Sequence, residues 1–240
     1  MTTPLLWPID QVTLPVVGRP EAFPVRRVYC VGRNYLDHIR EMREGDERDD
    51  PFFFQKPADA IVADGSSVPY PPQTDDLQFE GELVVAIGAE GADIGPGDAL
   101  APVFGFAAGI DLTRRDRQRE CREMARPWEA GKSFDHSAPC GPVLPADQAA
   151  WSPSGELRLS VNGEPRQHTG LNLMIWNVPE IISHLSGSYR LMPGDLIYTG
   201  TPAGVAPVRP GDRIRVDITG LPALTVAISE GDTCAPQRTA

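Results

Sequence analysis

The chain has 240 residues, among them 25 prolines and 23 glycines, and its formal net charge at pH 7 is −11. This length favours one sizeable domain, and the many turn-forming residues favour short strands over a helical bundle. The acidic balance argues against a nucleic-acid or anionic-membrane surface, because both require a basic footprint.

Three segments are expected along the chain: a short proline-rich arm over residues 1–24, the main domain over 25–230 and a frayed tail over 231–240. The start lacks a signal-peptide pattern and the longest near-apolar run, 99–110, is too short to span a bilayer, so we expect a cytoplasmic protein. The cysteines carry no metal or disulfide spacing and are expected to be reduced thiols, mostly in the core: Cys30, Cys121, Cys140 and Cys234.

A short strand over 28–31 is followed by Gly32 and by a predicted helix over about 36–43. His38 and Glu41 stand three residues apart and therefore share one face of that helix. A carboxylate beside an imidazole holds its tautomer and raises its basicity, as a general base acting on water requires. The alternative is an ordinary surface ion pair.

The charged segment 44–50 has the composition of a loop, and with the preceding helix it could act as a lid. Three phenylalanines at 52–54 then lead to Lys56, and residues 58–62 are predicted to continue as a strand. A lysine in such an apolar setting usually meets an anion or a carboxylate.

Two acids stand at the head of the predicted strand 79–87. Glu80 and Glu82 are two residues apart, so their side chains point in the same direction. Two ionised carboxylates entering a core need compensation, and a hard divalent cation supplies it: Mg²⁺ or Mn²⁺, with Ca²⁺ as a further option, rather than Zn²⁺. The alternative is that both acids lie on the solvated face of a half-exposed strand.

Asp111 directly follows the next apolar run, 99–110, and is a candidate third ligand. Thr113 and Asp116 have the spacing of a capping box that opens a helix to about Ala125. That helix is rich in arginine, which predicts a solvated face, with one or two side chains near Asp111 free to face an anionic substrate.

The remaining third of the chain is read as strands, one hairpin and one helix. Asn162-Gly163 is the strongest hairpin signal, and the small-residue loop 199–204 could hold a carboxylate. The predicted strands are 157–161, 196–198, 213–218 and 221–228, and the predicted helix is 180–186, with Gly187 after its end.

Five short motifs together resemble the fumarylacetoacetate hydrolase family over about residues 27–228. They are Cys-Val-Gly-Arg-Asn-Tyr-Leu-Asp-His38 with Glu41, Glu80-x-Glu82, Asp111-Leu-Thr-x-Arg115-Asp, Gly131-Lys132-Ser-Phe-Asp and Thr199-Gly-Thr-Pro-Ala-Gly. Three residues depart from the family pattern and leave the pocket shape open: Phe79, Cys140 and Ala206.

The resemblance implies an α+β, mainly β fold, a mixed β-sandwich roll with a few short helices that usually forms a homodimer. It implies that Glu80, Glu82 and Asp111 bind Mg²⁺ or Mn²⁺. It also implies that His38 and Glu41 activate water on a lid, with Lys132 as a further catalytic group. The residues implied to contact the substrate are Arg33, Arg115, Gln118, Lys132 and Thr201.

Within the family, the segments at 51–62 and 131–139 are most similar to fumarylpyruvate hydrolases of the gentisate route of aromatic degradation. The implied reaction is hydrolysis of a carbon–carbon bond in a small 2,4-dioxo acid, with fumarylpyruvate giving fumarate and pyruvate. Acylpyruvase activity, oxaloacetate decarboxylation and oxo-acid isomerisation on the same metal site are the alternatives. A non-catalytic metal-dependent binding protein is disfavoured, since it would leave His38, Glu41 and Lys132 without a purpose.

Overall fold

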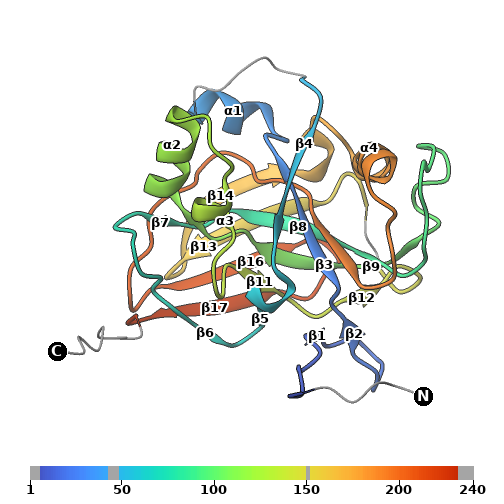
Figure 1. The fold of residues 1–240 in the computed structure, drawn as a ribbon, viewed down its shortest axis with the longest axis horizontal. Helices are drawn as coiled ribbons and strands as arrows, with labels where there is room; N and C mark the ends of the chain where they lie inside the picture. Colours follow the sequence, from blue (N-terminus) through green and yellow to red (C-terminus); the bar gives the residue numbers. More distant parts are fainter. Residues whose placement is uncertain (1–5, 43–48, 150–151, 232–240) are drawn as a thin grey trace.

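Two β-sheets form most of the computed structural model, which describes residues 6–42, 49–149 and 152–231. The larger sheet has eight strands, in the order β4 (Phe52–Lys56), β3 (Arg27–Gly32), β15 (Asp195–Tyr198), β8 (Gly81–Ile87), β9 (Val103–Ile110), β11 (Ala138–Cys140) and β5 (Ile61–Ala63), with β12 (Leu144–Pro145) also on β9. The smaller sheet has five, in the order β14 (Glu164–Gly170), β13 (Glu156–Val161), β16 (Arg213–Ile218), β17 (Leu224–Ser229) and β6 (Ser67–Pro69). The predicted mainly β fold is confirmed (Figure 1).

Helices and short ribbons complete the fold. The α-helices are α1 (Leu36–Met42), α2 (Arg115–Glu123), α3 (Glu129–Lys132) and α4 (Val178–Ser188), and 3₁₀ turns lie at Ala58–Ala60 and Leu171–Leu173. Two-stranded ribbons pair β1 (Thr13–Leu14) with β2 (Phe23–Pro24) and β7 (Leu77–Gln78) with β10 (Thr113–Arg114). No helix of the described ranges is both long and apolar enough to cross a membrane.

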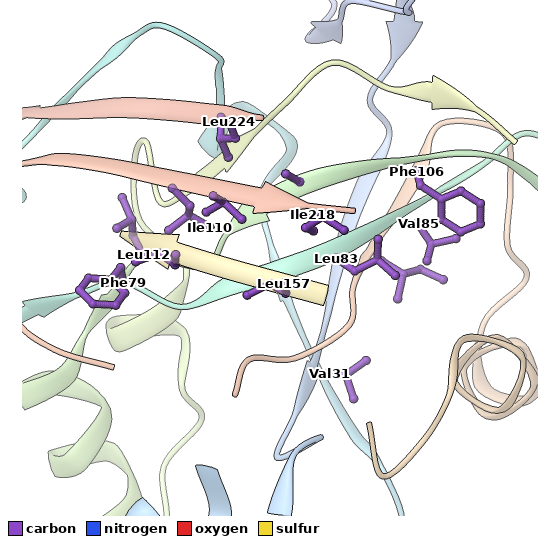
Figure 2. Close-up of a cluster of buried hydrophobic side chains, with 14 of the residues drawn as sticks. Val31, Phe79, Leu83, Val85, Phe106, Ile110, Leu112, Leu157, Ile218 and Leu224 are labelled. Carbon is purple, nitrogen blue, oxygen red and sulfur yellow. The ribbon is translucent and has the colours of Figure 1, made fainter. Parts of the chain in front are cut away.

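The main core fills the space between the two sheets. Side chains alternate along each strand, so Leu83 and Val85 of β8 point toward the smaller sheet. The smaller sheet contributes Leu157 and Ile218 to the same cluster (Figure 2). Ile110 at the end of β9 joins the same cluster. This packing fixes the positions of the strand ends in the large sheet at which the acids lie.

A second apolar cluster covers the outer face of the large sheet. The ribbon β1–β2 places Leu14 and Phe23 there, against the opposite side chains of the same strands, such as Val84 and Leu196. The ribbon β1–β2 therefore packs on the large sheet, while the segments 1–24, 25–230 and 231–240 stay predictions.

Local signals succeeded where the chain itself decides the conformation. Asn162 and Gly163 both have positive φ, 54° and 84°, as a two-residue hairpin turn requires, and they join β13 to β14. Helix α4 begins with a capping box between Asn177 and Glu180 but continues through Gly187, which was predicted to lie beyond its end.

Two local predictions were wrong. Thr113 and Asp116 do not form a capping box: Thr113 belongs to β10, and Asp116 accepts hydrogen bonds from Thr74 Oγ1 at 2.6 Å and from the Asp75 and Arg117 backbone. Residues 58–62 begin as a 3₁₀ turn, and the strand starts only at Ile61. Cys234, most of the tail 231–240 and residues 43–48 of the expected lid loop lie outside the described residues.

Candidate active site

The candidate site lies where strands β3, β8, β9 and β15 meet. β8 and β9 are antiparallel and pair Gly81 with Ile110, so Glu80 and Asp111 are cross-strand neighbours, joined by a 2.8 Å bond from the Asp111 N–H to the Glu80 carbonyl. Glu82 lies two residues along β8 and therefore on the same face as Glu80. The predicted convergence of the acids follows from this register.

The ends of β3 and β15 bring helix α1, with His38 and Glu41, and the loop 199–204 to the same place. These strands are parallel and pair Cys30 with Tyr198, so the start of α1 and the loop after Tyr198 emerge side by side. The buried Asn34 side chain ties them, donating to the Thr199 carbonyl at 2.8 Å and the Trp176 carbonyl at 2.9 Å. Gly200 has a φ of 92°, and a Cβ there would lie 2.7 Å from Asn34 Cβ, so this close approach requires glycine.

Three carboxylates are gathered in the interior. One oxygen from each of Glu80, Glu82 and Asp111 can be chosen so that all lie within 4.8 Å of one another, and all three residues are buried. The predicted alternative, a solvated strand face, is therefore excluded for Glu80 and Glu82.

Positive groups surround two of these acids. The Lys132 ammonium contacts Glu80 Oε2 and Asp111 Oδ2, each at 2.7 Å, and Thr113 Oγ1 at 2.8 Å. The Arg115 guanidinium pairs with Glu80 Oε1. Burial alone would raise the pKa of Glu80, but the charges of Lys132 and Arg115 hold it well below its ordinary value.

Glu82 is less well compensated. It accepts one 2.6 Å hydrogen bond from the Gly200 N–H. Burial, together with the charges of Asp111 and Glu80, raises the pKa of Glu82 well above its ordinary value. A further positive charge at this point would favour the ionised carboxylate.

The residues present fit a hard divalent cation. The donor set consists of carboxylate oxygens, which suits Mg²⁺ or Mn²⁺. Among the described residues Asp111 Oδ1 has no hydrogen-bond donor, although Lys56 Nζ lies 2.8 Å away as a charge partner. The poorly compensated Glu82 carboxylate is the feature that a dication would satisfy.

His38 and Glu41 form the predicted pair on one face of α1. His38 Nδ1 lies 3.4 Å from Glu41 Oε2, and His38 is buried. The hydrogen bond with His38 lowers the pKa of Glu41, and the Gly204 N–H adds bonds of 3.1 and 3.2 Å to the same carboxylate. Glu41 therefore links the imidazole to the loop after β15.

The predicted substrate contacts meet in one cavity. Arg115 donates to Gln118 Oε1 at 2.5 Å, and the Thr201 hydroxyl donates to the Gly81 carbonyl at 3.0 Å. The cavity volume is about 30 Å³, and its lining is Val31, Gly32, Arg33, His38, Phe54, Glu80, Glu82, Arg115, Gln118, Trp128, Lys132 and Thr201. This volume is sufficient for an ion or a water molecule.

The other arginines of the α2 region face away from this cavity. Arg117 pairs with Glu120 at 2.9 Å, and Arg119 pairs with Asp76 at 2.8 Å. Arg115 alone of the residues on α2 carries a buried guanidinium into the site. The sequence predicted a solvated face with one or two arginines turned toward the site, and Arg115 is the one that lines the cavity.

Sequence reasoning missed the buried Gln167 of β14. Its amide accepts from the Gly81 N–H at 2.9 Å and donates to Thr201 Oγ1 at 2.9 Å and to the Pro202 carbonyl at 2.8 Å. The smaller sheet thus braces the loop after β15. Gln167 is buried between the exposed Arg166 and His168, and the polar sequence of β14 gave no signal of this.

Comparison with known proteins places this geometry among related chains. The family model described as "Fumarylacetoacetate (FAA) hydrolase C-terminal" matches residues 27–229. A fumarylpyruvate hydrolase of Ralstonia sp is 40% identical over 181 residues, covering 75% of this chain and 94% of the relative. The mitochondrial oxaloacetate tautomerase of Homo sapiens is 38% identical over 205 residues, covering 85% of this chain and 92% of the relative.

A solved structure extends the likeness to the fold. The fumarylpyruvate hydrolase of Pseudomonas aeruginosa, in complex with Mn²⁺ and pyruvate, superposes with a TM-score of 0.91 at 49% identity. The match covers 95% of this chain and the whole of the other.

Proposed function

Since the chain belongs to the fumarylacetoacetate hydrolase family, we propose that it hydrolyses a carbon–carbon bond of a 2,4-dioxo acid, with fumarylpyruvate as the substrate. Water adds a hydroxyl group to the 4-oxo carbon, the bond to carbon 3 breaks, and a proton is delivered to what becomes the methyl group of pyruvate. Fumarate is the other product. The observation that carries the proposal is the cavity that Glu80 and Glu82 share with His38 and Lys132, with Asp111 buried beside both glutamates.

Glu80, Glu82 and Asp111 would hold Mg²⁺ or Mn²⁺. Lys132 and Arg115 compensate only part of the negative charge of these three acids, so a cation can still bind them. When bound, the ion would attract the oxygens of the 2-oxo acid and stabilise negative charge on the departing pyruvate. A relative from Pseudomonas aeruginosa has been solved with Mn²⁺ and pyruvate, which supports this choice of ion and product.

His38 is the group suited to take a proton from water. Its Nδ1 faces Glu41, so the other ring nitrogen is left for the cavity, and the Glu41 carboxylate stabilises the imidazolium that proton transfer creates. The Gly204 N–H holds Glu41 in turn. General-base assistance of this kind is worth about 10²- to 10⁴-fold in rate.

Lys132, Arg115, Gln118 and Thr201 would position the acidic end of the substrate. The Lys132 ammonium is fixed by Glu80, Asp111 and Thr113. Burial alone would lower the pKa of Lys132, but the charges of Asp111 and Glu80 raise it above its ordinary value, so the group stays cationic. A fixed cation at the point where negative charge develops lowers the barrier without having to reorganise.

The acyl end would meet an aromatic wall with a cation beside it. Phe54 and Trp128 line the cavity with their ring centroids 6.0 Å apart, and Arg33 lies over the Phe52 ring at 5.5 Å. A flat, unsaturated chain that ends in a carboxylate suits this wall better than a methyl group does.

A second candidate is keto–enol interconversion of oxaloacetate, which the human relative's name favours. It would use the same acids and no attacking water. Decarboxylation of oxaloacetate is a further possibility on the same site, as the name of a 38% identical Dictyostelium discoideum relative indicates.

Isotope labelling separates these reactions. Purified protein with Mn²⁺ and fumarylpyruvate in H₂¹⁸O should yield fumarate and pyruvate in equal amounts, with solvent oxygen in the new fumarate carboxylate. Absence of both products, together with rapid enol–keto conversion or CO₂ release from oxaloacetate, would overturn hydrolysis in favour of the second candidate.

A further inference from the structure

Lys56, the last residue of β4, is a second buried lysine beside the candidate metal ligands. Its side chain has no exposed area, and its Nζ lies 2.8 Å from Asp111 Oδ1. The same ammonium donates to the Leu112 carbonyl at 3.1 Å and to the Lys132 carbonyl. Lys56 is not among the residues that line the cavity.

These contacts bracket Asp111 between two ammonium groups. Lys56 lies against Oδ1, whereas Lys132 lies against Oδ2 at 2.7 Å. Lys56 therefore adds a positive charge to the carboxylate set through the Asp111 oxygen that Lys132 does not contact. Such a charge opposes the binding of a dication to Asp111.

Lys56 also anchors the backbone that carries Lys132. Helix α3 has four residues, and the carbonyls at its end have no partner within so short a helix. Lys56 supplies a donor to the last of them. Gly131 lets the same turn approach α2, since a Cβ there would lie 2.8 Å from the Gln118 nitrogen.

We propose that Lys56 is a positioning residue that holds Lys132 in reach of Glu80 and Asp111, and that its charge weakens the affinity of the acid triad for the metal. The first effect rests on the proposed function. The second concerns metal binding alone and can be measured without a substrate.

Three variants separate the two effects. Lys56→Met removes both the charge and the donor, Lys56→Gln removes the charge but retains a donor for a nearby carbonyl, and Lys56→Arg retains the charge. Mn²⁺ affinity is measured by calorimetry on metal-free protein, and kcat and KM are measured with fumarylpyruvate at saturating Mn²⁺.

Lys56→Met should bind Mn²⁺ at least fivefold more tightly than the wild type, while kcat falls at least 50-fold and KM stays within threefold. Lys56→Gln should share the tighter binding but lose less of kcat, and Lys56→Arg should keep the wild-type Mn²⁺ affinity. General damage to the fold would instead weaken binding and turnover together.

Weaker or unchanged Mn²⁺ binding in both neutral variants would overturn the charge effect. A kcat within threefold of the wild type in Lys56→Met would overturn the positioning effect. If Lys56→Met does not fold, the charge effect is decided by comparing the Mn²⁺ affinities of Lys56→Gln and Lys56→Arg. In that case a kcat of Lys56→Gln within threefold of the wild type would overturn the positioning effect. If the wild type fails to cleave fumarylpyruvate, the proposed function falls, while the Mn²⁺ comparison still decides the charge effect.

Discussion

Replacing Glu82 by glutamine should stabilise the protein in the absence of metal and abolish its response to metal. Glu82 is buried beside two other acids, at an oxygen separation of up to 4.8 Å. Two unit charges at that distance repel by about 3.5 kcal/mol at an effective dielectric constant of 20. A neutral amide removes this repulsion and can still accept the hydrogen bond from Gly200.

A second estimate gives a similar magnitude. The wild type can relieve the repulsion by keeping a proton on Glu82, whose ordinary pKa is 4.5. Each pH unit above that value costs about 1.4 kcal/mol, so holding the proton at pH 7 costs about 3 kcal/mol. The folded state then binds a proton that the unfolded state releases, so the stability of the metal-free wild type falls as pH rises above about 4.5.

Thermal unfolding at pH 7, with and without Mn²⁺, measures both effects. One kcal/mol shifts Tm by about 2–4 °C in a chain of this size, so metal-free Glu82→Gln should melt at least about 5 °C above the metal-free wild type. Mn²⁺ at 100 times its Kd should stabilise the wild type by about 2.7 kcal/mol and the variant hardly at all.

The exposed Glu164 in the β13–β14 hairpin provides the control, because Glu164→Gln removes the same charge from a solvent-exposed position outside the acid triad and should change neither Tm nor the Mn²⁺ response. The advantage of Glu82→Gln should also shrink as pH is lowered toward 4.5. The reasoning would be refuted if metal-free Glu82→Gln melted below the metal-free wild type. It would also be refuted if Mn²⁺ stabilised the variant as much as it stabilises the wild type.

Three further predictions follow from other contacts. His38→Gln should lower kcat about 10²- to 10⁴-fold and leave the calorimetric Mn²⁺ affinity within twofold, and a parallel loss of Mn²⁺ binding would contradict its role as a base. Arg33→Gln should lower kcat/KM for fumarylpyruvate at least about 10-fold, because it removes a charge-assisted contact with the distal carboxylate. The kcat/KM for acetylpyruvate, which lacks that carboxylate, should fall less than threefold. Equal losses for the two substrates would exclude recognition of the distal carboxylate by Arg33. Asp116→Asn should be less stable than the wild type at pH 7, because Thr74 and the Asp75 and Arg117 N–H groups, against the opposing effect of burial, lower the pKa of Asp116. That stabilisation is present above the ordinary value of 3.8 and is lost as pH falls through the lowered folded pKa, so the two melting curves should converge in acid; a constant gap down to about pH 2 would argue against the carboxylate as the cause.

Periodicity predicted the directions of the acidic side chains, and the family resemblance joined the three acids into one site. The two-residue repeat of a strand places Glu80 and Glu82 on one face, and an acid directly after an apolar run places Asp111 at a strand end. The i, i+3 spacing on a helix likewise placed His38 beside Glu41. Each of these arrangements depends on a single element and its end.

Contacts between distant segments were beyond the reach of such patterns. Lys56 meets the Lys132 carbonyl 76 residues away, and Gln167 bridges to Gly81 86 residues away. The capping-box prediction failed for the same reason, because Thr74 on a neighbouring connection binds the Asp116 carboxylate. Tertiary partners therefore decided the roles that local spacing left open.

The central claim is that Glu80, Glu82 and Asp111 together hold one divalent cation. The most direct measurement is anomalous diffraction from a crystal soaked in Mn²⁺, recorded at the manganese edge. We expect one strong peak per chain, at about 2.0–2.4 Å from an oxygen of each of these carboxylates, and its disappearance in Glu82→Gln. No peak at this position, or a peak bound by other residues, would contradict the account.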